Sequence, residues 1–203
     1  MPFHEKLNDY MEKTVKIEEY NPDWVSEFQL EKARIMEVLK NDSLCVEHIG
    51  STSIKGLGAK PILDIIACVH HLAEADMFIE PLKSIGYEFV LHKEFPERLF
   101  FRKGQWRAGT HHLHIYKYGS EQWKNQLSFG DYLRSYPDIR SQYQELKLSL
   151  VQKHPADIVG YTKAKAPFIL SVIELANAEN GRNYNCQERL KGGFHEKGRS
   201  RTI

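Results

Sequence analysis

Short apolar runs dominate the first two thirds of the chain. They occupy residues 44–49, 62–69, 87–91, 99–102 and 112–117, and Gly, Pro, Ser or charged residues lie between them. Runs of this length with such boundaries are typical of β-strands. The pattern therefore predicts a sheet whose strands are mostly antiparallel, and the alternation at 15–18 predicts a further edge strand.

Helical periodicity separates and follows these runs. Asn21 and Pro22 predict a helix start, with Asn21 as N-cap, and apolar residues recur at helical spacing as far as Leu39. A second helix is expected over 76–85, shortened or kinked by Pro81 and ended by Gly86.

From residue 120 onward the pattern becomes helical throughout. One helix is expected over 122–135, a second begins at Pro137, and a third is capped by Thr162 and ends near Ala178. Few apolar residues follow Asn180, which predicts a flexible tail. The whole pattern predicts an α/β (α+β) fold in which helices flank a sheet and a C-terminal helical segment packs on it.

Composition narrows the class of protein. With 203 residues, 41% of them hydrophobic, the chain suits one domain with a real core, and a net charge of +1 makes nucleic-acid partners unlikely. No segment has the length and apolarity of a signal peptide core or a membrane span. Cys45, Cys68 and Cys186 show no metal-site spacing, so we expect reduced thiols in a cytoplasmic protein, the first two in the core.

A Gly-Ser turn follows the first long apolar run. Gly50, Ser51, Thr52 and Ser53 offer backbone N–H groups, hydroxyls and close approach for a phosphate, and Lys60 adds positive charge nearby. The alternative is a connecting loop whose hydroxyls cap the next segment, and the turn taken alone favours this reading.

Asp64 is the residue that most needs an explanation. It interrupts the apolar run Ile62-Leu63-Asp64-Ile65-Ile66, where a charged group is costly unless it is paired, binds a metal or faces a cleft. A carboxylate beside a Gly-Ser turn suits a divalent metal that holds nucleotide phosphates. The alternative is a buried acceptor for the amides and hydroxyls of the turn itself.

Histidines form a further candidate cluster. His112 and His114 share one face of a predicted strand and would bind a metal or a phosphate, and His48 directly precedes the Gly-Ser turn. A polar, solvent-facing strand edge explains the pair equally well. Among the arginines of the segment 98–107, Arg102 is a candidate phosphate ligand, although ordinary solvated strand charges explain that segment too.

These motifs together resemble the GrpB family, the glutamate-rich protein B group of small bacterial proteins. The resemblance is carried by the stretches 19–24, 48–57, 60–65, 112–114, 131–134 and 161–165. It implies one domain over 15–178, with an N-terminal extension at 1–14 and a tail at 179–203. A Pro is usual in the family where this chain has Lys55.

The family in turn resembles nucleotidyltransferases of the polymerase-beta type, which implies a mixed sheet flanked by helices. In that superfamily a Gly-Ser turn precedes an Asp-x-Asp pair on the next strand. Asp64 matches the first carboxylate, whereas Ile66 stands where the second would be. His112, His114 or His48 would replace the missing ligand, and imidazole favours Zn²⁺ or Mn²⁺ over Mg²⁺. Some relatives are fused to dephospho-coenzyme A kinase, which links the family to coenzyme A metabolism.

Two functions remain open. In the first, the protein transfers a nucleotidyl group, with Asp64 as the catalytic metal-binding residue and a nucleotide or phosphorylated small molecule in the cleft. In the second, the same fold binds a nucleotide or a coenzyme A-like ligand without chemistry, as a regulatory module. The isoleucine in the carboxylate position favours the second function, and a protein-interaction domain is a third, weaker alternative.

Overall fold

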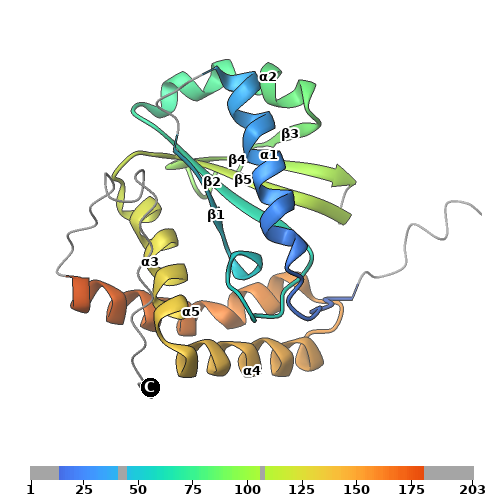
Figure 1. Ribbon diagram of the computed structural model, residues 1–203, viewed down its shortest axis with the longest axis vertical. Helices are drawn as coiled ribbons and strands as arrows, with labels where there is room; N and C mark the ends of the chain where they lie inside the picture. The colour runs from blue at the N-terminus through green and yellow to red at the C-terminus, as the bar shows by residue number, and fades with distance from the viewer. Residues whose placement is uncertain (1–13, 41–44, 106–107, 181–203) are drawn as a thin grey trace, which may run out of the picture.

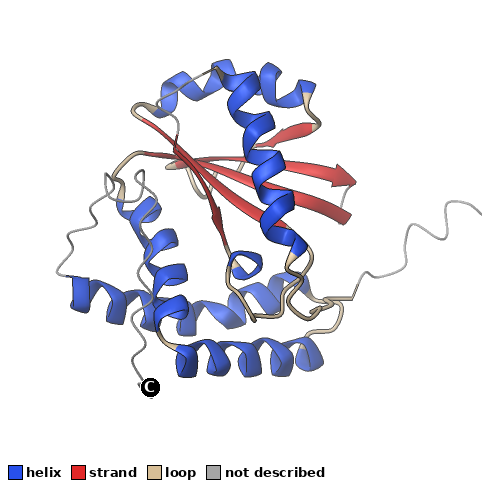
Figure 2. Ribbon diagram, viewed as in Figure 1, coloured by secondary structure: helices blue, strands red, loops and turns tan. Residues whose placement is uncertain are grey.

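The computed structural model describes residues 14–40, 45–105 and 108–180. Within them, one mixed sheet has the strand order β1-β2-β5-β4-β3 (Figures 1 and 2). The strands are β1 (Cys45–Ile49), β2 (Leu63–Val69), β3 (Tyr87–Val90), β4 (Arg98–Gln105) and β5 (Ala108–Lys117). β2 and β5 are parallel, and every other neighbouring pair is antiparallel. The α/β expectation is confirmed.

Helices cover both faces of this sheet. They are α1 (Asp23–Leu39), α2 (Ile79–Ser84), α3 (Glu121–Ser135), α4 (Pro137–Lys153) and α5 (Ile158–Asn180). Figure 1 shows α1 crossing the sheet, with α3, α4 and α5 gathered on the opposite side. None of the described helices combines the length and apolarity needed to cross a membrane.

The alternation along β2 explains the two layers. Leu63, Ile65 and Ala67 point into a core shared with α1, whereas Ile66 and Cys68 pack towards α3. Successive side chains of a strand point to opposite faces, so both faces of this central strand are covered. Asp64 lies on the same face as Ile66, near the start of β2, and lines a cleft that residues of α4 and α5 also border. The two strand cysteines, Cys45 and Cys68, are free and buried, as expected.

The predicted edge strand at 15–18 is wrong. Only Glu18 pairs, in an isolated bridge to Ala59 with backbone N···O distances of 2.8 and 2.9 Å. Pro61, two residues beyond Ala59, has no N–H to donate, so the ladder cannot extend in that direction.

Two helix expectations also change. The segment expected as one helix over 76–85 is a 3₁₀ helix at Leu72–Phe78 followed by α2, because Pro81 cannot donate to a carbonyl one turn earlier. Thr162 lies inside α5, where its hydroxyl donates to the Ile158 carbonyl at 2.8 Å. The Asp157 carboxylate caps this helix instead, by accepting the Gly160 N–H at 2.8 Å.

A buried ion pair fastens α1 to the sheet. The Glu31 side chain is 2% exposed and accepts from Lys103 Nζ of β4 at 2.8 Å and from Arg34 Nη1 at 3.3 Å. Burial alone would raise the pKa of Glu31, but the hydrogen bond and charge of Lys103 hold it below its ordinary value. The carboxylate therefore stays ionised inside the core and depends on Lys103.

We expect Lys103→Met to lower the free energy of unfolding by about 3 kcal/mol, because a buried carboxylate loses its main partner. Lys83→Met is the control, since Lys83 and Glu80 form an exposed pair whose loss costs less than about 0.5 kcal/mol. Urea unfolding measures both variants. Equal midpoints for Lys103→Met and the wild type would show that the pair contributes nothing.

Candidate functional site

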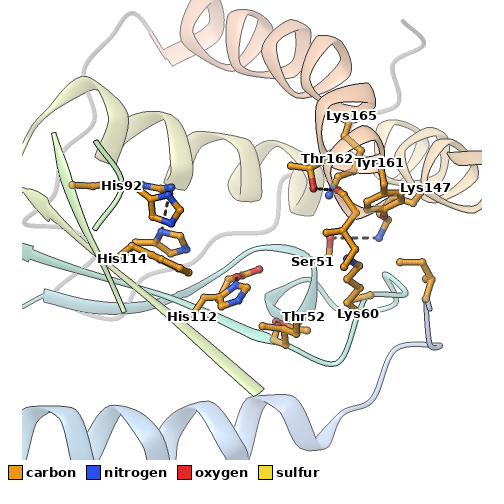
Figure 3. Close-up of a pocket in the computed structure, with 17 residues that line it drawn as sticks. Ser51, Thr52, Lys60, His92, His112, His114, Lys147, Tyr161, Thr162 and Lys165 are labelled. Atoms are coloured by element: carbon orange, nitrogen blue, oxygen red, sulfur yellow. Dashed lines mark hydrogen bonds and ion pairs between the residues drawn. The ribbon is translucent and has the colours of Figure 1, made fainter. Parts of the chain in front are cut away.

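A cleft of about 440 Å³ opens between the sheet and the C-terminal helices. Its walls come from the turn after β1, from β2, β4 and β5, and from α4 and α5 (Figure 3). Segments more than one hundred residues apart in sequence therefore meet around one hollow. Of the residues that the sequence singles out, the cleft is lined by Ser51, Thr52, Lys60, Asp64, His112 and His114.

Asp64, His112 and His114 form one cluster at the centre of the cleft. The parallel register places His112 beside Asp64 and His114 beside Ile66. His112 Nδ1 lies 3.0 Å from Asp64 Oδ1, and one potential ligand atom from each of the three residues lies within 4.8 Å of the other two. The side chains of Asp64 and His112 are each about one third exposed, so they remain accessible from the cleft.

The protonation states of this cluster suit a metal ion. Burial alone would raise the pKa of Asp64, but its hydrogen bond with His112 and its electrostatic interactions with His112, His114 and Lys165 lower it. Burial lowers the pKa of His114 to about 3; Asp64 opposes this shift and the nearby Arg98 charge adds to it. At neutral pH the cluster thus offers an ionised carboxylate and a neutral His114, whose one lone pair either accepts a hydrogen bond from Arg98 or binds a metal.

An imidazole of β5 lies beside Asp64, where the superfamily motif would place a second carboxylate of β2. Ile66 is fully buried and packs with Cys68, Tyr116 and Trp123, so β2 offers the cleft no other acid. His114 of β5 is the register partner of Ile66, and its imidazole lies beside Asp64. Among the described residues, this triad is the one group of three potential ligands.

The Gly-Ser turn is held mostly by bonds to its own surroundings. The Ser53 hydroxyl donates to the Gly50 carbonyl at 2.8 Å and accepts from Arg134 Nη2 of α3 at 2.7 Å. Thr52 Oγ1 lies 2.9 Å from His48 Nε2 and 3.3 Å from the Ile62 carbonyl. Ser51 and Thr52 both line the cleft, and the Ser51 hydroxyl lies 3.4 Å from Lys147 Nζ.

His48 and Arg102 lie apart from the triad. His48 stacks on Phe28 with ring centroids 4.8 Å apart, and burial together with the Arg134 charge lowers its pKa to about 4. Arg102 shares the sheet face of His112, but its guanidinium binds Glu88 at 2.6 Å and does not line the cleft.

Gly50 holds the turn against Asp64. Its φ of +69° with ψ of −174° is a conformation that essentially only glycine adopts, and a Cβ there would lie 2.5 Å from Asp64 Oδ2.

We expect Gly50→Ala to lower the free energy of unfolding by about 1–3 kcal/mol and to weaken metal binding, because the carboxylate must move. Gly119→Ala also places an alanine at a positive φ, +73°, but its Cβ would meet nothing within 4 Å. Equal losses of Zn²⁺ affinity in the two variants, measured calorimetrically, would contradict this account.

Three lysines form the opposite wall of the cleft, and two of them, Lys147 and Lys165, are not among the site residues predicted from the sequence. Lys147 of α4 is 2% exposed, and its Nζ donates to the Gly58 carbonyl and to Ser51 Oγ. Lys165 of α5 and Lys60 lie over the Tyr161 ring, 4.5 and 5.2 Å from its centroid. Lys147 was detectable, because it occupies the apolar stripe of its helix between Tyr143 and Leu150.

This wall of the cleft brings three lysines close together. Burial and the Lys165 charge lower the pKa of Lys147 to about 7, and burial and the Lys60 charge lower that of Lys165 to about 8, with Asp64 opposing. Burial likewise lowers the pKa of Lys60. Since Asp64 is the acid that lines the cleft, these lysines lack enough negative charge. A polyanion would supply it.

Comparisons with known proteins point to one family. Residues 14–175 match the model of the family described as "GrpB protein". The protein YqkA of Bacillus subtilis, of the UPF0157 group, is 34% identical over 91% of this chain, which spans 56% of that relative's length. The crystal structure of the conserved protein GrpB from Enterococcus faecalis is 36% identical, covers 82% of this chain and 99% of its own, and superposes with a TM-score of 0.75.

More distant matches concern the fold and a group of kinases. GLD-2 in its complex with RNP-8 is 11% identical but superposes with a TM-score of 0.59 over 98% of this chain and 78% of its own, a likeness of fold alone. The architecture is thus nucleotidyltransferase-like, as expected. Three mycobacterial proteins named dephospho-CoA kinase match at 26–29% identity, over less than half of their length.

Proposed function

This chain belongs to the GrpB family, and we propose that its cleft binds a nucleoside triphosphate with one divalent transition-metal ion and transfers the nucleotidyl group to a small acceptor. One observation carries the proposal. A carboxylate and two imidazoles face three poorly compensated lysines across the same 440 Å³ cleft. A metal-bound polyphosphate satisfies both groups at once.

Asp64, His112 and His114 would hold the ion, which when bound acts as a Lewis acid on phosphate oxygens. Two nitrogen ligands and one oxygen ligand suit Zn²⁺ or Mn²⁺ better than Mg²⁺, which prefers oxygen. Gly50 keeps the turn close to the Asp64 carboxylate, and the His112 bond orients that carboxylate.

Lys147 and Lys165 would bind pyrophosphate, the leaving group. In the transfer, an acceptor hydroxyl oxygen bonds to the α-phosphorus, the bond from that phosphorus to the bridging oxygen of the β-phosphate breaks, and the hydroxyl proton passes to water. The negative charge that develops on pyrophosphate is then stabilised by Lys147 and Lys165, with Ser51 as a hydroxyl donor.

A thermal-shift screen tests this proposal. Each nucleoside triphosphate is combined with Mn²⁺, Zn²⁺, Mg²⁺ or EDTA, and dephospho-coenzyme A is included because of the kinase matches. We expect one triphosphate to raise the melting temperature with Mn²⁺ or Zn²⁺ by more than the sum of the two separate shifts. If no nucleotide shifts the melting temperature under any condition, the proposal is wrong.

A non-catalytic binding module is the second candidate, and the buried Ile66 favours it. Two-metal phosphoryl chemistry needs carboxylates that bridge the ions, and β2 carries a single one. This candidate predicts nucleotide binding that is the same with EDTA and in the Asp64→Asn variant. Metal-dependent release of pyrophosphate during incubation with the triphosphate and a mixture of small alcohols would exclude it.

A further inference from the structure

Arg98 of β4 enters the cleft without a carboxylate partner. Its Nη1 lies 3.0 Å from His114 Nδ1, and its Nε is buried with no hydrogen-bond partner. Within the described part of the chain it forms no ion pair, although it lines the same cleft as the triad. A guanidinium has five donors in a fixed fork that matches a carboxylate or a phosphate. Arg98 is therefore arranged for an anion that the protein does not supply.

Apolar rings surround this guanidinium. It lies 4.7 Å from the Phe95 ring centroid and 5.6 Å from that of Phe100, and the His92 and Phe100 rings are 5.2 Å apart. Phe95 is 46% exposed and Leu91, in the same loop, 67%. We call His92, Arg98 and Phe100, which line the cleft, together with Phe95, which packs against Arg98 without lining it, the Arg98 pocket. It combines one positive charge with flat apolar surface.

The Arg98 pocket and the lysines lie at opposite ends of the cleft. Figure 3 shows His92 and His114 at one end, Lys147 and Lys165 at the other, and His112 between them. Phosphoryl transfer places the attacking and leaving oxygens roughly in line on opposite sides of the phosphorus. If pyrophosphate leaves towards the lysines, the acceptor arrives from the side of Arg98.

We propose that the Arg98 pocket binds the acceptor, and that this acceptor is a small molecule with an anionic group beside a flat or apolar ring. The inference rests on the proposed function, which makes the lysine end the polyphosphate end. The fork of Arg98 binds the anion, and Phe95 and Phe100 cover the ring. The same pocket disfavours acceptors without an anionic group, because they leave the Arg98 guanidinium without an anionic partner.

Calorimetric titration with phenyl phosphate tests the pocket. The protein is saturated with pyrophosphate, so that the lysine end is occupied, and phenyl phosphate is then added. We expect Arg98→Gln to weaken its binding by about tenfold or more, because a charge-assisted bidentate contact is lost. Arg102→Gln is the matched control, four residues along the same strand and on the same face but bound to Glu88, and it should change the affinity less than about twofold.

Three further arms make the result specific. Phe95→Ala, at an exposed position where loss of the fold is not expected, should also weaken phenyl phosphate binding. Inorganic phosphate should bind more weakly than phenyl phosphate, because it lacks the ring, and benzoate shows whether a carboxylate serves as the anion. Equal affinity of the wild type and Arg98→Gln, or no binding of either aromatic anion to the wild type, would overturn the inference. Failure of pyrophosphate to bind would instead refute the proposed function.

Discussion

Replacing Asp64 with Asn should weaken Zn²⁺ binding by about 100-fold or more, the largest effect that we expect from any single substitution. Asn has nearly the same size and can still bond His112, so the fold should survive. The variant lacks the negative charge, however, and leaves two imidazoles as the remaining ligands of the triad. Isothermal titration calorimetry measures the change directly.

His48→Gln is the control for this measurement. His48 is a candidate ligand from the sequence, but its Nε2 lies 2.9 Å from Thr52 Oγ1 and its ring stacks on Phe28. We expect the Zn²⁺ affinity of His48→Gln to stay within about twofold of the wild type. A loss as large as that of Asp64→Asn would place His48 in the metal site, and an unchanged affinity in Asp64→Asn would remove the carboxylate from it.

The second large effect concerns pH and the lysine wall. Burial keeps the pKa of Lys147 at about 7 and that of Lys165 at about 8, so both lose their protons as the pH rises from 6 to 9. The protonated forms attract anions and the neutral forms do not. Pyrophosphate affinity, measured without metal, should therefore be highest near pH 6 and fall as the pH rises through these values.

Lys147→Met should lower pyrophosphate affinity at pH 6 by about tenfold and flatten its pH dependence, because a charge-assisted hydrogen bond is lost. The groups that face Lys147 are Ser51, the Gly58 carbonyl, the Tyr143 ring and Lys165. Lys163→Met is the matched control, since Lys163 is exposed on the same helix as Lys165 and does not line the cleft. An affinity that rises with pH, or equal losses in the two variants, would contradict this picture of the wall.

The three residues at the centre of the candidate site, Asp64, His112 and His114, were predictable because successive side chains of a strand point to opposite faces. Alternation along two apolar segments placed Asp64 in a costly position and put His112 and His114 on one face. The parallel pairing of β2 with β5, which brings these groups together, comes from tertiary structure. Sequence spacing contains no information on which distant strands become neighbours.

The periphery of the site was harder to predict. Lys147 is conspicuous in the apolar stripe of its helix, but its contact with Ser51 joins residues 96 positions apart and depends on how the helix packs. Arg98 and Arg102 occupy equivalent positions in the strand pattern, yet Glu88 neutralises Arg102 and leaves Arg98 for the cleft. Such distinctions depend on the side chains of neighbouring elements.

The most direct test of the account is whether metal and polyphosphate meet at the triad. ³¹P NMR of a slowly hydrolysed triphosphate analogue bound to the protein reports this, because Mn²⁺ broadens the signals of phosphorus atoms close to it. We predict that one equivalent of Mn²⁺ broadens the phosphate resonances of the bound analogue in the wild type but not in Asp64→Asn. Sharp resonances in both proteins, or equal broadening in both, would contradict the claim that Asp64, His112 and His114 bring metal and nucleotide together.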